Sequence, residues 1–193
     1  SKGVEKMMAK LRPFIEKDTE DSKNEKKIFH REEILDLVQK EINEFLGHLM
    51  AGNVTMDVME EGRSQIRMAD EYESISDYIT TILKLTIKLR KEELSISQIH
   101  REELLDMHDH VADYIALINN AVKSGTGEVV SKARSQGETI THLMKQYRKN
   151  HLERIGTEHT SPLESLTISD ILNAYRRIKD HALNIAEVLS GEK

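Results

Sequence analysis

The sequence predicts an all-α protein without a β-sheet. Three observations support this: Leu, Ile, Glu, Lys, Ala and Met dominate the chain, turn-forming residues are few, and no window shows sustained alternation of β-branched and polar residues. Among 193 residues there are only 2 prolines and 9 glycines. A helical chain of this length can bury a sizeable hydrophobic core.

Six segments carry apolar residues at helical spacing and are expected to pack as a bundle with short connections. The first, residues 2–17, is a short amphipathic arm, and the polar residues 18–27 are expected to form a linker after it. Ser161-Pro162 is typical of a helix start. The five longer helices are expected at 28–51, 54–93, 98–123, 127–155 and 161–190.

Composition and charge exclude several classes of protein. The chain has no cysteine, so it forms no disulfide and no thiolate metal site, which fits a reducing cytoplasm. A net charge of −6 argues against nucleic-acid binding and suits cations instead. No apolar run is long enough to span a membrane or to serve as an export signal. The chain starts at Ser1 without an initiator Met, so we expect it to be part of a longer protein.

One five-residue pattern recurs in four of the expected helices. Each copy has an isoleucine at its centre, at Ile34, Ile75, Ile140 and Ile178. Residues four apart lie on one helix face, so the flanking residues form a pair on the face away from the isoleucine. We therefore expect the four isoleucines in equivalent core positions. The copies are Glu32–Asp36, Glu73–Asp77, Glu138–His142 and Arg176–Asp180.

These pairs are candidates for cation binding. Antiparallel packing around the turn at Gly52-Asn53 brings the first two copies to similar heights, and the loop at 156–162 does the same for the last two. A single Glu-x-x-x-Asp motif is more often a solvated helix face. Four aligned copies of repelling carboxylates favour a bound cation.

The last helix carries the best motif. RRIKDHALNIAE at Arg176–Glu187 resembles the closing helix of PhoU-type domains, and DEYESISDYI at Asp70–Ile79 resembles the matching helix of the first half. With YRKNHLERI at Tyr147–Ile155, the chain is most similar to the PhoU domain of sodium/phosphate-cotransporter proteins over about residues 1–190. The resemblance implies two pseudo-repeated three-helix halves, 1–95 (with the arm and linker at 1–27) and 96–193, which together form one PhoU-like domain.

The resemblance also implies metal bound on the surface. Divalent or trivalent ions such as iron or zinc are expected at Glu32, Asp36, Glu73 and Asp77 in the first half, and at Glu138, His142 and Asp180 in the second. Arg176 departs from the family's Glu and His142 from its Asp, while Ser76 and Lys179 stand where Gly is usual. Because Arg stays charged, we expect Arg176 to replace the cation by pairing with Asp180 or Glu138, so that the halves bind metal unequally.

The implied function is a non-catalytic regulatory or interaction domain in phosphate transport or homeostasis. The expected partner is a transmembrane transporter portion, a phosphate-signalling protein or a second copy of the chain. Residues 2–17 would lead from the membrane part and pack against the first half, which places the domain on the cytoplasmic side of the inner membrane.

Catalytic alternatives have weaker support. A metal-dependent hydrolase on an all-α bundle is the main one, but no Glu has a His three residues later, as di-iron centres require. A phosphotransfer role for His142 lacks the expected glycine. In the fourth helix, Asp106, His110 and Asp113 share a face that is expected to be solvated, and His108 is expected to pack at the core rim.

Overall fold

A computed structural model describes residues 1–17, 20–155 and 161–192. These residues form six α-helices and no strand, as the sequence predicts. The helices are α1 (Lys2–Glu16), α2 (Ser22–Met50), α3 (Met56–Lys91), α4 (Gln98–Ser124), α5 (Val129–Ile155) and α6 (Pro162–Leu189).

Side-chain caps fix where most of these helices begin. Ser161 Oγ accepts a hydrogen bond of 3.0 Å from the Glu164 backbone N–H, and Pro162 occupies the first turn, as the sequence predicts. The predicted linker at 18–27 is wrong over residues 22–27, which form the first turns of α2, whereas Glu20 and Asp21 precede the helix; residues 18–19 lie outside the described part. Asp21 caps α2 by accepting from Asn24 N–H at 3.0 Å, so the helix starts at Ser22. A capped run of Lys and Glu forms a helix even without apolar residues.

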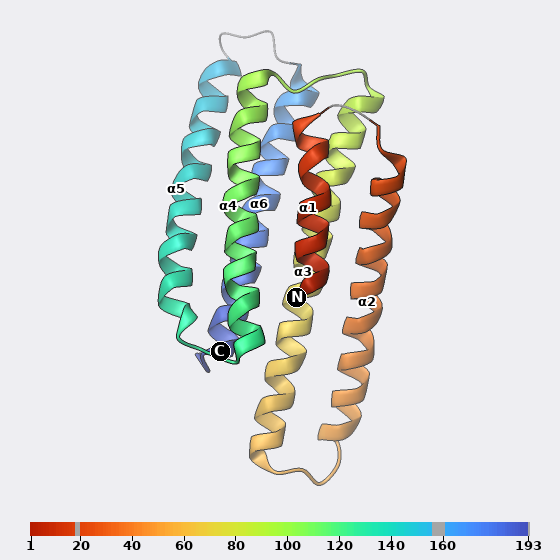
Figure 1. The fold of residues 1–193 in the computed structure, drawn as a ribbon, viewed down its shortest axis with the longest axis vertical. Helices are drawn as coiled ribbons and strands as arrows, with labels where there is room; N and C mark the ends of the chain where they lie inside the picture. Colours follow the sequence, from red (N-terminus) through yellow and green to blue (C-terminus); the bar gives the residue numbers. More distant parts are fainter. Residues whose placement is uncertain (18–19, 156–160, 193) are drawn as a thin grey trace.

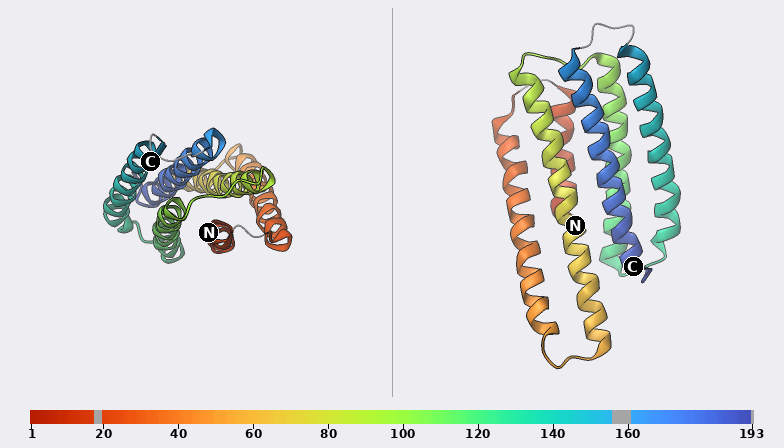
Figure 2. Two further views of the ribbon diagram at one scale, coloured as in Figure 1. Left: turned by 90° about the horizontal axis from the view of Figure 1, so that it is seen from above. Right: turned by 180° about the vertical axis from the view of Figure 1, so that it is seen from behind.

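The helices form two groups of three that meet along α3 and α6. Figures 1 and 2 show α3 and α6 side by side in the middle, with α2 outside α3 and α5 outside α6. Helix α1 contacts α2 and α3 of its own half, as expected, and also α4 of the other. Arg12 of α1 forms a bidentate ion pair with Asp109 of α4, at 2.8 and 2.9 Å. The arm therefore joins both halves.

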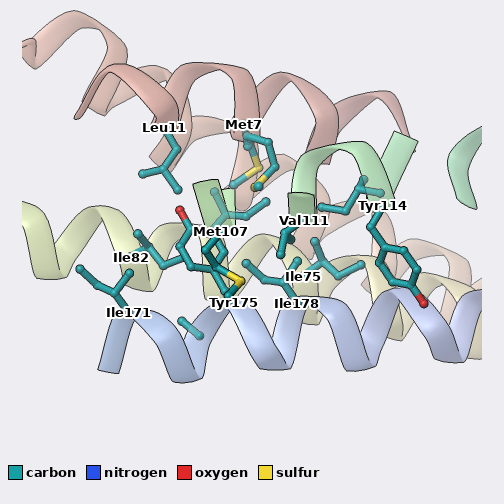
Figure 3. Packing of buried hydrophobic residues seen from close by; sticks show 14 of the residues in the cluster. Met7, Leu11, Ile75, Ile82, Met107, Val111, Tyr114, Ile171, Tyr175 and Ile178 are labelled. Carbon is teal, nitrogen blue, oxygen red and sulfur yellow. The ribbon is translucent and has the colours of Figure 1, made fainter. Parts of the chain in front are cut away.

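The core lies where α1, α3, α4 and α6 converge (Figure 3). Ile75 and Ile178 are fully buried there, and Ile140 is 3% exposed. Ile34 is 45% exposed, so the prediction that all four isoleucines occupy equivalent core positions is wrong for α2. The reason is the rotation of α2 about its own axis: Ile28 is buried and Leu35 packs against the core, whereas Ile34 lies about 100° around the helix from Leu35.

None of the helices in the described part of the chain is both long and apolar enough to cross a lipid bilayer.

Candidate functional site

The four carboxylates predicted for the first half come together between α2 and α3. Burial raises the pKa of Glu32, and the negative charge of Asp77 raises it further. Burial likewise raises the pKa of Glu73, and the negative charges of Asp77 and Asp36 raise it further. Carboxylates that raise each other's pKa lie close enough to repel, so the antiparallel packing of α2 and α3 has placed the two motifs at the same height.

Few cations offset this negative charge. Lys40 Nζ lies 2.8 Å from Asp36 Oδ2, and the charge of Lys84 lowers the pKa of Glu32. Among the described residues, no group of three or more Asp, Glu or His side chains is arranged so that it could hold a metal ion. Glu32, Asp36 and Glu73 are half-buried and Asp77 is exposed, so the four carboxylates are neighbours that do not form a preassembled metal site. Such a set suits a hard or intermediate cation that keeps some of its water.

The second-half residues do not form an equivalent cluster. Glu138 and His142 are exposed, and His142 Nδ1 lies 3.2 Å from the Glu138 backbone oxygen. Lys179 Nζ lies 2.5 Å from Asp180 Oδ1 and supplies the positive charge that we expected from Arg176. Arg176 forms no ion pair within the described part of the chain, so its predicted bridge to Asp180 or Glu138 is wrong.

The position of Lys179 explains this difference. Its side chain is only 11% exposed, so the stem runs through the interior and brings the ammonium group out beside Asp180. Gly137 of α5 leaves room for that stem, since a Cβ there would lie 3.4 Å from Lys179 Cδ. A mostly buried lysine thus pairs with Asp180, one of the residues at which the resemblance implied a metal.

The DHA-x-N segment of α6 contacts the other half of the molecule. His181 Nδ1 lies 2.6 Å from Glu71 Oε2, and Asn184 Nδ2 donates to Glu71 Oε1 at 3.0 Å. The His181 ring also stacks on Tyr78, with ring centroids 5.6 Å apart. Our sequence reasoning missed this contact, although a His and an Asn three residues apart on an apolar helix could have indicated a polar partner.

Tyr78 and His181 are equivalent positions of the repeat, because each follows the last acid of its motif. Equivalent residues that touch across the interface of α3 and α6 indicate a pseudo-two-fold axis between them. This pair therefore lies at the interface between the halves.

Replacing Glu71 with alanine is expected to lower the free energy of unfolding by ~1–3 kcal/mol, because two hydrogen bonds of a half-buried carboxylate are lost. Urea denaturation measures this change. Glu60, an exposed acid on the same helix, is the matched control, and its alanine variant should stay within about 0.5 kcal/mol of the parent. Equal losses in the two variants would show that the contact does not stabilise the interface.

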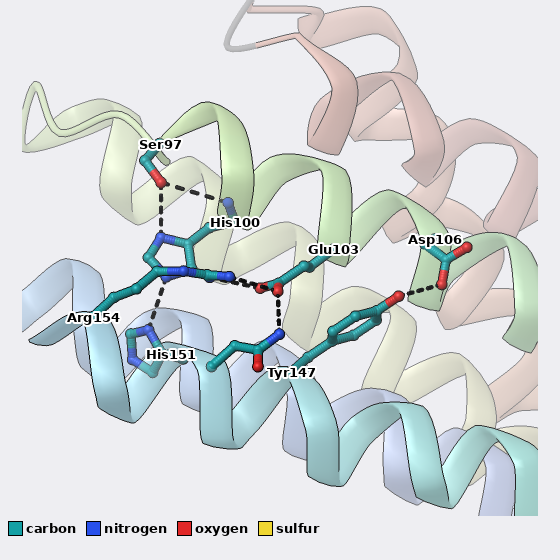
Figure 4. A network of polar contacts seen from close by, with 8 residues as sticks. Ser97, His100, Glu103, Asp106, Tyr147, His151 and Arg154 are labelled. Atoms are coloured by element: carbon teal, nitrogen blue, oxygen red, sulfur yellow. Dashed lines mark hydrogen bonds and ion pairs between the residues drawn. The ribbon is translucent and has the colours of Figure 1, made fainter.

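A polar network holds α4 against α5 (Figure 4). Glu103 pairs bidentately with Arg154 at 2.7 and 2.8 Å and accepts from Asn150 at 2.8 Å. Burial opposes ionisation of Glu103, but these hydrogen bonds prevail and lower its pKa. Tyr147 donates to Asp106 at 2.5 Å, so part of the polar face predicted to be solvated packs against α5.

Two buried histidines extend this network to α6. His151 Nε2 lies 3.0 Å from both the carbonyl oxygen and the hydroxyl oxygen of Ser165. His151 Nδ1 lies 3.1 Å from His100 Nε2. His100 Nδ1 in turn lies 2.9 Å from the Ser97 hydroxyl. These contacts join α4, α5 and α6.

His108 is packed, as the sequence predicts, but at 1% exposure it lies inside the core and not at the predicted rim. Its Nδ1 lies 2.9 Å from the Tyr175 hydroxyl. Burial, partly opposed by the charge of Asp109, lowers the pKa of His108 to about 4. The imidazole is therefore neutral at physiological pH and acts as a structural hydrogen-bonding group.

The described helices form two three-helix units that are related by a pseudo-two-fold axis. In the first unit, the acidic pair on α2 faces the acidic pair on α3. These features define the class of all-α domains to which the chain belongs. The family model of the PhoU domain matches residues 1–86 and again residues 104–189. The chain therefore belongs to the PhoU domain family. No curated protein sequence is significantly similar to it.

Solved structures show the same fold. PhoU from Pseudomonas aeruginosa superposes with a TM-score of 0.87 at 18% identity, covering 97% of this chain and 88% of that one. The phosphate transport system regulatory protein PhoU from Streptococcus pneumoniae gives 0.74 at 20% identity, covering 96% and 86%. A putative PhoU-like phosphate regulatory protein from Shewanella oneidensis gives 0.57 at 13% identity, covering 98% and 92%.

Proposed function

We propose that this chain is a non-catalytic regulatory domain in phosphate transport or homeostasis, which binds a metal ion on the first-half carboxylates. Membership of the PhoU family supports the regulatory role, as do the names of the similar structures from Pseudomonas and Streptococcus. The domain acts by contacting other proteins, because the described site offers carboxylates and no nucleophile with an adjacent base.

The observation that carries the metal proposal is the raised pKa of Glu32 and Glu73. Gathering four acids against one paired lysine costs free energy, and a bound cation relieves it. All-oxygen donors suit a divalent or trivalent ion such as iron, and nitrogen is absent from this set. The ion would join α2 to α3 and hold the first half in one arrangement.

The proposed setting is the cytoplasmic face of a sodium-dependent phosphate transporter, with the domain tethered to the inner membrane through its parent chain. The partner is then the transmembrane portion or a phosphate-signalling protein. The resemblance of the α3, α5 and α6 motifs to cotransporter PhoU domains supports this setting.

Metal analysis of Asp77→Asn and Asp180→Asn tests the site. Asp77 lies within hydrogen-bonding reach of both Glu32 and Glu73, so its loss should weaken metal affinity at least about tenfold. Asp180 already pairs with Lys179, so Asp180→Asn should change affinity less than about twofold. Calorimetric titration with Mn²⁺, Fe²⁺ and Zn²⁺ measures both variants against the parent.

The reverse order, with Asp180→Asn abolishing binding and Asp77→Asn leaving it intact, contradicts the proposed site. Magnesium-dependent hydrolysis of nucleoside triphosphates by the purified chain would contradict the non-catalytic role. Retention of the helical far-UV circular dichroism by both variants is the control for folding.

A further inference from the structure

The interface between α3 and α6 is unequal on the two sides of the pseudo-two-fold axis. The repeat register that aligns Tyr78 with His181 also aligns Glu71 with Ala174. On one side, Glu71 of α3 reaches across the interface to His181 and Asn184 of α6. On the other side, the methyl group of Ala174 is too short to make the equivalent contact with α3. Only one side of the axis therefore has a carboxylate in this place.

A pocket of about 370 Å³ lies on the side without the carboxylate. Ala174 lines it together with Tyr78 and Thr81, which are the repeat equivalents of the two residues that Glu71 contacts. The pocket thus corresponds in place to the Glu71 carboxylate of the other side. Because a water molecule takes up about 30 Å³ in the liquid, the pocket has room for a phosphate-sized ion and several waters. Its other lining residues are Leu85, Asp170, Asn173, Arg176 and Arg177.

Two arginines give this pocket a charge opposite to that of its counterpart. Arg176 stands where the other half has Glu73, and Arg177 where it has Ser74. Neither arginine forms an ion pair with another residue in the described ranges. The Nε atom of Arg176 is also buried without a hydrogen-bond partner there. A buried donor without an acceptor is unfavourable, so an anion that draws this guanidinium group into a bidentate contact would stabilise the protein.

Asp170 restricts which anion fits. It lines the same pocket, and a carboxylate can only accept hydrogen bonds. Inorganic phosphate keeps at least one proton at pH 7 and can donate it to such an acceptor. Sulfate and carboxylate ions carry no proton at this pH, and a phosphate monoester, whose second pKa is about 6, has mostly lost it. The pair of arginines with one carboxylate therefore favours inorganic phosphate.

We propose that this pocket binds inorganic phosphate between α3 and α6, with Arg176 and Arg177 as donors and Asp170 as the acceptor of the phosphate proton. The bound ion bridges the two halves, as Glu71 does on the other side of the axis. The inference deepens the proposed regulatory function and rests on it for its biological role. Occupancy of the pocket couples the concentration of phosphate to the packing of the two halves.

Isothermal titration calorimetry of the purified chain with sodium phosphate tests the pocket, at pH 7 in a phosphate-free buffer without added metal. We expect a Kd of about 1 mM or below, and at least about tenfold weaker binding of sulfate and of methyl phosphate. Arg176→Gln and Arg177→Gln should each weaken phosphate binding at least about tenfold. Arg148→Gln, which removes an exposed arginine of α5 outside the pocket, is the matched control and should change the Kd less than about twofold.

Two further variants test how the ion is held. Asp170→Asn replaces an acceptor by a side chain that can also donate, so the Kd values of sulfate and phosphate should move to within about threefold of each other. Ala174→Glu places in the pocket the carboxylate that Glu71 supplies on the other side, and it should abolish phosphate binding. Far-UV circular dichroism is the control for folding of each variant.

The absence of phosphate binding, equal binding of sulfate by the parent, or equal affinities of the Arg176→Gln and Arg148→Gln variants would overturn the inference. Tighter binding of methyl phosphate than of inorganic phosphate would contradict the role of Asp170. A parent chain that binds Mn²⁺ but not phosphate contradicts this inference alone, and a chain that binds phosphate but no metal contradicts only the metal site.

Discussion

Replacing Ile75 with alanine is expected to lower the free energy of unfolding by ~2–5 kcal/mol. The side chain is fully buried where α1, α3, α4 and α6 meet, so truncation loses its contacts and leaves a cavity that rigid helices cannot close. Urea denaturation followed by far-UV circular dichroism at pH 7 measures the loss.

Ile34→Ala is the matched control, since Ile34 occupies the equivalent position in the other helix of the same half. Its side chain is 45% exposed, so the expected change is below about 1 kcal/mol. Similar losses at the two positions would mean that α2 is covered in solution by something that the fold of the isolated chain does not show.

Stability is expected to fall as the pH decreases from 6.5 to 4, with His108 contributing ~3 kcal/mol to the loss. The unfolded state binds a proton at His108 with an ordinary pKa of about 6.5, whereas burial lowers the pKa in the folded state to about 4. Between these values the unfolded state binds more protons, so acid favours unfolding. Above pH 6.5 the contribution is complete.

His108→Gln isolates this contribution because glutamine can keep a hydrogen bond to Tyr175 but does not titrate. The parent and the variant are compared by urea denaturation at pH values from 4.5 to 7.5. The free-energy curve of the parent should be steeper than that of the variant between pH 4.5 and 6.5. Parallel curves would mean that His108 is accessible to protons in the folded state.

Much of the fold follows from local patterns in the sequence. Apolar spacing and caps such as Ser161 determine the helices, and three of the four repeat isoleucines are buried as expected. The error at Ile34 has a tertiary cause: α2 turns Ile28 and Leu35 toward the core instead of Ile34, and the repeat pattern does not determine that rotation. The sequence places the start of α2 too late, because the first residues of the helix are polar and resemble a linker. Asp21 nevertheless caps this polar run as the start of a helix.

The candidate site, too, was only partly predictable from the sequence. The approach of Glu32, Asp36, Glu73 and Asp77 follows from helix rise and turn position, which sequence contains. The pairing of Asp180 with Lys179 does not follow from helix rise and turn position, because the stem of Lys179 passes Gly137 of another helix. The contact of Glu71 with His181 joins positions 110 residues apart, and a single sequence carries no direct signal of such a pair.

The stacking of Tyr78 on His181 has an evolutionary consequence. A residue on a two-fold axis meets its own copy, so this contact has the geometry of an interface between two identical three-helix subunits. In a homodimer every substitution appears twice, and a lysine or arginine in one acidic motif would enter the other as well. A chain that carries both copies is free of this constraint. Glu73 could then remain acidic while Arg176 became basic at the equivalent position, and one half could specialise without changing the other.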